Sequence, residues 1–194
     1  MKTRKKKTLL CGVAILFFLL VNRIDAQEFN LVNSESSLKV YGTSSLHDWH
    51  VEAEEQKGKI LFDDISKGQI GKLEVEIVAE SLKSGKRSMD KNTYEALKTS
   101  DYKSILFQLT EVKKVEAKGN GKFNLTAQGD LTIAGVKKNV AINFTITING
   151  SKVNLEGEKT FKMTDFKVEP PTALFGTVTT GDEVTVKFNT VLKS

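Results

Sequence analysis

The stretch KNVAINFTITING, residues 138–150, alternates apolar and polar side chains from end to end. One parity holds the large apolar side chains Val140, Ile142, Phe144, Ile146 and Ile148. This period of two is typical of a β-strand with one buried face, and the Asn149–Gly150 pair is typical of a tight hairpin turn. The stretch therefore predicts a long strand that is followed at once by an antiparallel neighbour.

The same alternation returns through most of the remaining sequence. It occupies the stretches 36–42, 47–55, 71–80, 103–112, 121–133, 151–163 and 182–192. Turn pairs at Asn120–Gly121 and Ala134–Gly135 separate several of these stretches, so strands adjacent in the chain are expected to pair antiparallel. Eight or nine long antiparallel strands have exposed edges unless the sheet closes on itself. The sequence predicts an all-β chain that forms a single barrel.

One segment, Ser88–Thr99, departs from the alternation and predicts a helix. Ser88 is suited to cap the N-terminus, and Asp90 falls in the first turn. Side chains that could form an apolar face recur at helical spacing at Met89, Thr93, Ala96 and Leu97. A short helix between two barrel strands is expected to cover one end of the barrel.

The segment Lys167–Asp182 contains both prolines of the chain, Pro170 and Pro171. Proline lacks the N–H that an inner strand needs, so this segment predicts a second covering loop. Leu174 and Phe175 are expected to point into the barrel or toward a partner.

Residues 1–26 have the pattern of an export signal. The basic stretch 1–7 precedes an apolar run at 9–21, and Ala26 offers a small residue for cleavage. The apolar run is shorter than the ~20 residues that cross a bilayer. We expect cleavage after Ala26, a domain of residues 27–194, and a periplasmic or secreted location; an uncleaved N-terminal anchor is the alternative. Cys11 is the only cysteine, so the cleaved domain would have neither a disulfide nor a thiolate.

The net charge of +5 suggests a nucleic-acid partner until its distribution is considered. Residues 1–26 hold six basic side chains and one acidic side chain, which leaves 23 of each sign in residues 27–194. Arg87 is then the one arginine available for bidentate phosphate contacts. The composition therefore predicts no nucleic-acid partner.

The stretch GTSSLHDWH, residues 42–50, collects both histidines and the only tryptophan. Neighbouring side chains on an extended chain point apart, so Ser45, His47 and Asp48 are not expected to converge as a catalytic triad. His47 and His50 would lie on opposite faces of a strand, which disfavours a shared metal ion. No catalytic or metal-binding residue is predicted.

We interpret this stretch instead as the beginning of a strand. Gly42–Ser45 are expected to form a turn, and the strand begins near His47. The alternation then places His47, Trp49, Val51 and Ala53 on one face, the inner one, and the residues between them on the solvent face.

With the strands, the helix and the covering loop in this order, the chain resembles the YceI family of bacterial exported lipid-binding proteins over about residues 31–192. The resemblance is carried in order by SSLKVYGTSSLHDW (36–49), LEVEIVAESLKSGKRSMDKNTYEALKTSDYKSILFQL (73–109), GDLTIAGVKKNV (129–140), FKMTDFKVEPP (161–171) and GTVTTGDEVTVKF (176–188). It implies an extended eight-stranded antiparallel, lipocalin-like β-barrel with a long apolar ligand such as a polyisoprenoid inside, and it implies no catalytic motif. Ala134 stands where many members have histidine, so the resemblance implies no head-group preference.

Pattern and resemblance together predict an exported protein that sequesters or carries a long apolar lipid, of polyisoprenoid, quinone-like or fatty-acyl type. No covalent cofactor and no enzymatic activity are expected. Strands of about ten residues would give a barrel roughly 25 Å tall, and ten to fifteen buried carbons would contribute roughly 8–12 kcal/mol before the costs of association. The candidate ligand-binding residues are Trp49, Leu73, Val75, Ile77, Met89, Leu97, Phe107, Phe123, Leu125, Ile142, Phe144, Ile146, Met163, Phe175 and Phe188.

Two other functions stay open at this point. A barrel enzyme of isomerase or dehydratase type would need a titratable group in the lining, for which His47 and the acids near the mouth are candidates. A packed interaction domain would have no hollow interior, and periodicity does not distinguish a hollow interior from a filled one. Transient membrane contact and a homodimer are further expectations about partners.

Overall fold

The structure, a computed structural model, describes residues 27–173 and 176–194. The predicted export signal, Leu174 and Phe175 lie outside the described residues. The elements in chain order are β1 (Gln27–Leu31), η1 (Asn33–Glu35), β2 (Ser37–Ser44), β3 (Trp49–Ala53), β4 (Gln56–Asp64), η2 (Ile65–Lys67), β5 (Gln69–Val78), η3 (Ala79–Ser81), β6 (Leu82–Lys83), α1 (Arg87–Leu97), β7 (Ser104–Gly119), β8 (Lys122–Ile133), β9 (Val136–Asn149), β10 (Lys152–Lys162), η4 (Met163–Phe166), β11 (Thr172–Ala173) and β12 (Val178–Lys193).

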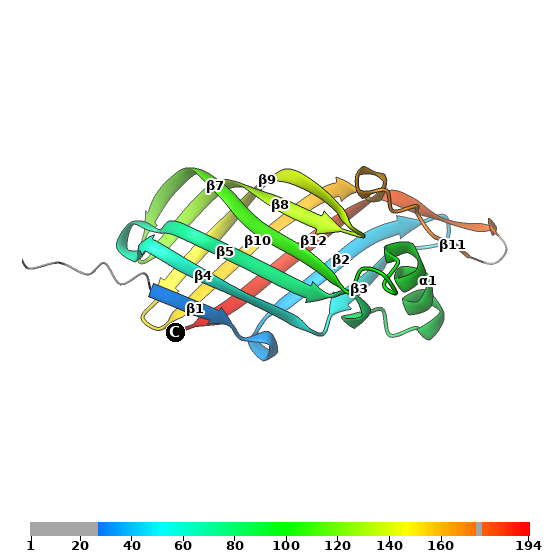
Figure 1. Ribbon diagram of the computed structural model, residues 1–194, viewed down its shortest axis with the longest axis horizontal. Helices are drawn as coiled ribbons and strands as arrows, with labels where there is room; N and C mark the ends of the chain where they lie inside the picture. Colours follow the sequence, from blue (N-terminus) through cyan, green and yellow to red (C-terminus); the bar gives the residue numbers. More distant parts are fainter. Residues whose placement is uncertain (1–26, 174–175) are drawn as a thin grey trace, which may run out of the picture.

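The strands close into a ring. Strands β1, β4, β5, β7, β8, β9, β10 and β12 pair in this order, and β12 pairs back to β1 through Asn30 with Lys193 and Leu31 with Leu192 (Figure 1). The result is a closed eight-stranded antiparallel β-barrel with one α-helix, α1, and four short 3-10 helices, η1–η4, in the described residues. The predicted extended, lipocalin-like barrel is therefore confirmed.

At three positions around the barrel, two shorter strands follow one another along the barrel in place of one long strand. Strand β2 continues the wall of β1, β3 precedes β4 in the next wall, and β6 continues the wall of β5. The breaks lie beside one another, because the Asn33 side chain donates to the Glu54 carbonyl at 2.7 Å and accepts from the Gln56 N–H at 2.9 Å. These breaks divide the barrel into a half near β1 and a half near α1.

Helix α1 covers the side of the barrel next to β6. Strand β6 pairs with β3 and, within the part of the chain that the structure describes, with no other strand. The Tyr94 hydroxyl of α1 donates to the Glu80 carbonyl at 2.8 Å and to the Leu82 carbonyl at 3.2 Å. Through residues 27–173 and 176–194, no helix is long and apolar enough to span a bilayer.

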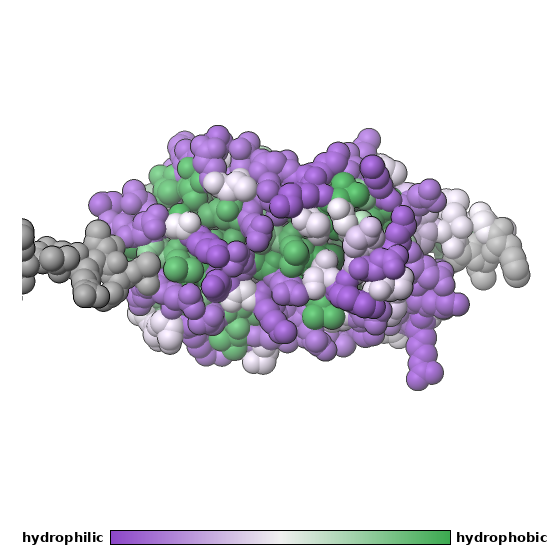
Figure 2. Space-filling model, in the orientation of Figure 1, coloured by the Kyte–Doolittle hydropathy of each residue, from purple (hydrophilic) through white to green (hydrophobic). Residues whose placement is uncertain are grey.

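The barrel is taller than the sequence analysis suggested. Strands β7 and β12 have 16 residues each, so at ~3.3 Å per residue and a tilt of ~40° the barrel is roughly 40 Å tall. Hydrophilic residues cover most of the outer face seen in Figure 2, with hydrophobic residues between them. A barrel of this height can be packed in one half and hollow in the other.

The half of the barrel near β1 has a solid interior. The Phe29 and Phe62 rings meet edge to face with centroids 5.9 Å apart, and both side chains are fully buried. Large apolar side chains from the surrounding strands fill the space around them: Ile60, Ile70, Leu73, Phe123, Leu125, Phe144, Ile146, Val153, Leu155 and Leu192. This half is an ordinary packed core.

Two predictions about the opening stretch and the helix start are wrong in detail. Gly42–Ser44 belong to β2, and the turn begins after Ser44 because the Ser44 hydroxyl accepts from the N–H of His47 at 3.2 Å. Ser88 does not cap α1, which begins at Arg87 without a side-chain cap. The inward placement of Trp49, Val51 and Ala53 in β3 agrees with the prediction, but β3 begins at Trp49, so His47 lies before the strand and is exposed.

The predicted covering loop is also partly strand. Residues 178–182 form the beginning of β12, and β11 pairs with it through Thr172 and Ala173. The two prolines precede β11 and lie in no strand, as expected for residues that cannot donate to a ladder.

The contrast along β9 gives a stability test. Ile146 is 0% exposed within the solid half, whereas Ile142 lies four residues nearer to α1 and is only partly buried. Ile146→Ala is expected to lower the free energy of unfolding by about 3–4 kcal/mol, and Ile142→Ala by about 1–1.5 kcal/mol, because only the first leaves a new cavity in packed surroundings.

Chemical denaturation of lipid-free protein measures both values. Equal losses of stability in the two variants would contradict a division into a solid half and a loosely filled half.

Candidate functional site

The half of the barrel near α1 encloses a cavity of about 920 Å³. Its floor is formed by Leu73, Phe144 and Leu155, which also belong to the packed cluster below. Its walls come from β2, β3, β5, β7, β8, β9, β10 and β12, and α1 supplies one side. The volume lies in the range of 300–1,000 Å³ that is usual for ligand pockets.

Most of the predicted lining residues stand in the wall of this cavity. They are Trp49, Leu73, Val75, Ile77, Met89, Leu97, Phe107, Ile142, Phe144, Met163 and Phe188. Phe123, Leu125 and Ile146 face inward as predicted, but they lie in the packed cluster and not in the cavity wall. Phe175 falls outside the described residues. Whether the wall residues contact a ligand stays a prediction.

The cavity wall also contains residues that the prediction did not name. Most continue an inward parity that was already visible in the sequence: Leu38, Val40, Val51, Ile105, Leu131, Ile133, Val140, Leu155, Phe161, Val184 and Val186. Phe166 and Val168 come from η4 and the segment after it, where no strand period exists to reveal them. The hollow part is therefore longer toward α1 than the predicted set indicated.

Glycines on the inner face leave space that aromatic rings of neighbouring strands occupy. A Cβ at Gly157 would lie 2.7 Å from the Phe188 ring, and a Cβ at Gly42 would lie 2.2 Å from the Trp49 ring. Gly129 has the same relation to the Phe107 ring, at 2.3 Å. Because each ring occupies the space of a missing side chain, it does not need to cross the lumen.

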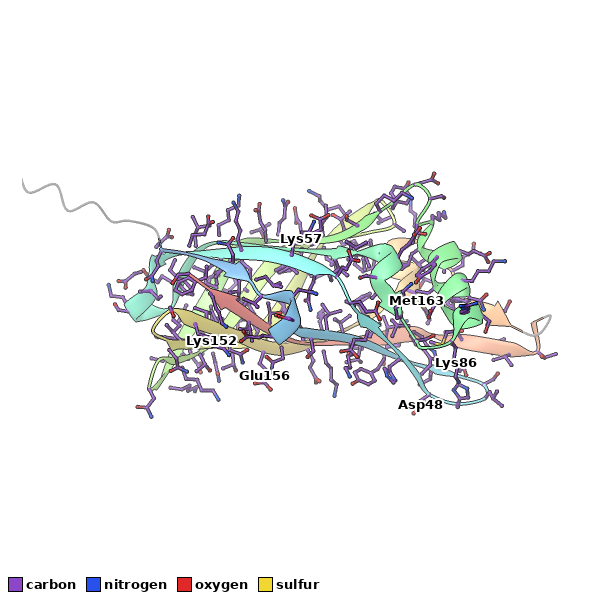
Figure 3. The ribbon with its side chains drawn as sticks, turned by 90° about the horizontal axis from the view of Figure 1, so that it is seen from below. Asp48, Lys57, Lys86, Lys152, Glu156 and Met163 are labelled. Atoms are coloured by element: carbon purple, nitrogen blue, oxygen red, sulfur yellow. The ribbon has the colours of Figure 1, made fainter. Side chains whose placement is uncertain are left out.

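Polar groups gather where the cavity opens. Ser44 at the end of β2 and His47 in the β2–β3 connection line it, together with Lys86 before α1 and Asn92 on α1; the apolar Leu46 lies among them. Leu46 is 68% exposed there. In Figure 3 the labelled Lys86 and Met163 both lie at the α1 end, whereas Lys57 points away from the barrel. The mouth is therefore at the end where α1, the β2–β3 connection and β11 meet (Figure 1).

Helix α1 covers the cavity without burying any of its own residues completely. Its partly buried side, with Met89, Thr93 and Leu97, faces the cavity. Polar contacts hold the helix from its edges: the Thr99 hydroxyl donates to the Glu80 carboxylate at 2.9 Å, and the Asp90 carboxylate accepts from Ser84. A helix held in this way can shift with less loss of packing than a helix inside a core.

The contact between Asp90 and Ser84 depends on the charge of the Asp90 carboxyl group. The Ser84 N–H and hydroxyl donate to the same Asp90 oxygen at 2.7 and 2.6 Å. Burial alone would raise the pKa of Asp90, but the two hydrogen bonds and the charge of Lys83 outweigh it and hold this pKa below its ordinary value. The carboxylate form is therefore the one that fastens the start of α1.

The cavity wall has little material for catalysis. Among the described residues that line it there is no aspartate and no glutamate, and its ionisable side chains are His47, Lys86 and Lys159. His47 is exposed at the rim, with Nδ1 2.8 Å from the Asp48 carbonyl oxygen. Through residues 27–173 and 176–194, no three His, Cys, Asp or Glu side chains gather as a metal site.

A closed antiparallel barrel with an apolar internal cavity defines a lipocalin-like class of fold. The model of the family described as "YceI-like domain" matches residues 28–192, and the chain belongs to the YceI family.

Solved structures share this fold. BcnA of Burkholderia cenocepacia is 22% identical, with a TM-score of 0.67 over 83% of this chain and 98% of that chain. A polyisoprenoid-binding domain from Saccharophagus degradans is 11% identical, with a TM-score of 0.66 over 86% and 98%. A YceI protein of Campylobacter jejuni is 22% identical, with a TM-score of 0.55 over 72% and 81%. Comparison with curated proteins gives no match.

The contact between Gly42 and Trp49 can be tested by fluorescence. Gly42→Ala is expected to displace the Trp49 ring, because the new Cβ would overlap it, and to weaken the 2.9 Å bond from Trp49 Nε1–H to the Thr43 carbonyl. Since Trp49 is the only tryptophan, its emission maximum reports this change directly. An unchanged emission spectrum in a folded G42A variant would contradict the contact.

The Asp90 contact predicts both a mutational effect and a pH effect on α1. Asp90→Asn is expected to speed amide exchange in α1 about tenfold, because charged hydrogen bonds contribute ~1.5–3 kcal/mol. Since the pKa of Asp90 in the folded protein lies below its ordinary value, the stabilisation is complete above the ordinary pKa of an aspartate and is lost as the pH falls through the lowered pKa.

Hydrogen exchange measured separately for α1 and for each strand detects both effects. Asp101→Asn serves as control because Asp101 is exposed and follows the C-terminal end of α1. Equal acceleration of α1 and of the barrel strands in D90N would show that the contact does not act on α1 in particular.

Proposed function

We propose that this protein is an exported carrier that holds a long apolar lipid in the hollow half of its barrel and does not alter it. The observation that carries the proposal is the apolar cavity of about 920 Å³ between α1 and the floor at Leu73, Phe144 and Leu155. At ~0.8 kcal/mol for each buried methylene, ten to fifteen carbons contribute roughly 8–12 kcal/mol before the costs of association. Binding that results from the burial of apolar surface requires no catalytic groups.

The comparisons support the class of ligand. The Saccharophagus degradans neighbour is described as a polyisoprenoid-binding domain, and its fold is shared over most of both chains. By analogy, a polyisoprenoid, quinone-like or fatty-acyl chain is the occupant that we propose here. The basic and apolar segments of residues 1–26 support export to the periplasm or the medium.

Binding without turnover is favoured over catalysis by the composition of the wall. General acid–base chemistry needs positioned titratable groups near the reacting atoms. The described wall offers no carboxylate to pair with His47, and His47 lies at the rim. A role as a filled interaction domain is disfavoured because the cavity is present.

Solvent extraction tests the proposal directly. The full chain is produced in an exporting bacterium, purified without detergent, and extracted with organic solvent for mass spectrometry. We expect about one long-chain lipid per protein. Protein that emerges free of lipid and cannot be loaded with any long-chain lipid would contradict the carrier function.

A variant that fills the cavity separates internal binding from surface adsorption. Val140 faces the cavity on β9, and its neighbour Ala141 faces outward and is exposed. Val140→Trp is expected to weaken lipid binding about tenfold or more, because the indole displaces at least two buried methylenes at ~0.8 kcal/mol each. Ala141→Trp adds the same side chain outside and is expected to leave binding unchanged.

Equilibrium loading of lipid-free protein, followed by mass spectrometry, measures the two affinities. Equal binding by V140W and A141W would place the lipid somewhere other than the cavity.

A further inference from the structure

Strand β10 carries a lysine on its inner face. The inward parity runs through Val153, Leu155, Gly157, Lys159 and Phe161, of which the first two are buried in the solid core. Lys159 pairs with Val186 of β12, and both line the cavity. A charged side chain thus occupies a position that alternation assigns to the interior.

The side chain of Lys159 has no partner in the part of the chain that the structure describes. Neither an ion pair nor a hydrogen bond of its side chain occurs among the described residues, whereas most surface lysines of the neighbouring strands have one. The acids beside it on β10 point to the opposite face: Glu158 pairs outside with Lys187 at 3.4 Å, and Glu156 points away from the barrel in Figure 3. Residues 27–173 and 176–194 therefore supply no counterion for this ammonium group.

The rest of the wall strengthens the same sign of charge. Lys86 stands at the rim, and the described lining residues include no carboxylate that would oppose the two lysines. A cation beside apolar surface is costly unless it is solvated or paired with an anion. When an apolar chain displaces water from the cavity, an anion carried by that chain would provide the missing partner.

The position of Lys159 sets where such an anion would lie. On the floor side, the Phe188 ring fills the space beside Gly157, and on the mouth side Phe161 packs on Phe166 with ring centroids 5.2 Å apart. Lys159 thus has apolar wall on both sides along its strand. An anion paired with it would be inside the cavity, not at the rim near Lys86.

We infer that the cavity selects a long-chain lipid with one anionic group, a carboxylate or a phosphate, which pairs with the Lys159 ammonium. The inference rests on the proposed carrier function and narrows its ligand class, since neutral quinone-like lipids lack the required charge.

Three ligands of equal chain length test the inference: hexadecanoate, hexadecyl phosphate and hexadecan-1-ol. Their affinities for the lipid-free full chain are measured by displacement of a neutral fluorescent dye. The wild-type protein is expected to bind at least one of the two anions about tenfold or more tightly than the alcohol, because charge-assisted hydrogen bonds are the strong ones. The anion that binds more tightly identifies the head group.

Four variants locate the anion. Lys159→Met is expected to remove the preference for the anion and to keep the affinity for the alcohol, and Lys159→Arg is expected to retain the preference. Lys57→Met removes an exposed, outward-facing lysine and serves as the matched control. Lys86→Met removes the cation at the rim and is expected to weaken the preference less than Lys159→Met does, whereas Lys57→Met is expected to behave as wild type.

The outcomes separate the two proposals. Loss of the preference in K86M instead of K159M, equal weakening of all three ligands in K159M, or no preference in the wild-type protein would each overturn the role of Lys159 while the carrier function stands. Failure of the wild-type protein to bind any of the three ligands would overturn the role of Lys159, and the solvent extraction then decides whether the carrier function stands.

Discussion

The short pairing of β1 with β12 closes the ring on which the rest of the structure depends. A closed barrel has no free edge and a fixed circumference, so its inward side chains must either fill the cross-section or leave it open. Near β1 they fill it, with Phe29 and Phe62 at the centre. Toward α1, strand β12 leaves β1 and pairs with β2, and the helix covers the side next to β6. The solid half anchors the ring, which leaves the other half free to stay hollow.

The hollow half stays open because of what its wall lacks. Glycine at three inward positions lets a neighbouring aromatic ring lie against the strand backbone, so that the wall is apolar but thin. The helix over this half is fastened by polar contacts at its edges and not by deep packing. Cavity, wall and cover thus follow from local features of the chain, and together they favour a guest that is long, apolar and held without covalent chemistry.

The fold could be predicted from the sequence because alternation states which face of each strand is inside. The alternation could not show which part of the interior is solid and which is hollow. Ile142 and Ile146 have the same parity, yet Ile142 lines the cavity and Ile146 is in the core. That division depends on whether side chains from opposite walls meet, which is a property of the closed ring. The prediction that Ser88 caps α1 was wrong for a similar reason. The start of the helix is held by the contact between Ser84 and Asp90, which depends on how the folded chain places these residues. The alternation along β10 already placed Lys159 on the inner face with its apolar neighbours. It was not named as a candidate because its side chain is charged.

The YceI fold in this chain is therefore best understood as a barrel with a packed base and an apolar chamber above it. The most direct test of that account is the electron density inside a crystal of the protein purified without detergent. We expect continuous, elongated density between α1 and the floor at Phe144 and Leu155, with none among the side chains around Phe29. Side chains that meet across the lumen along its whole length, with no space for a guest, would contradict it.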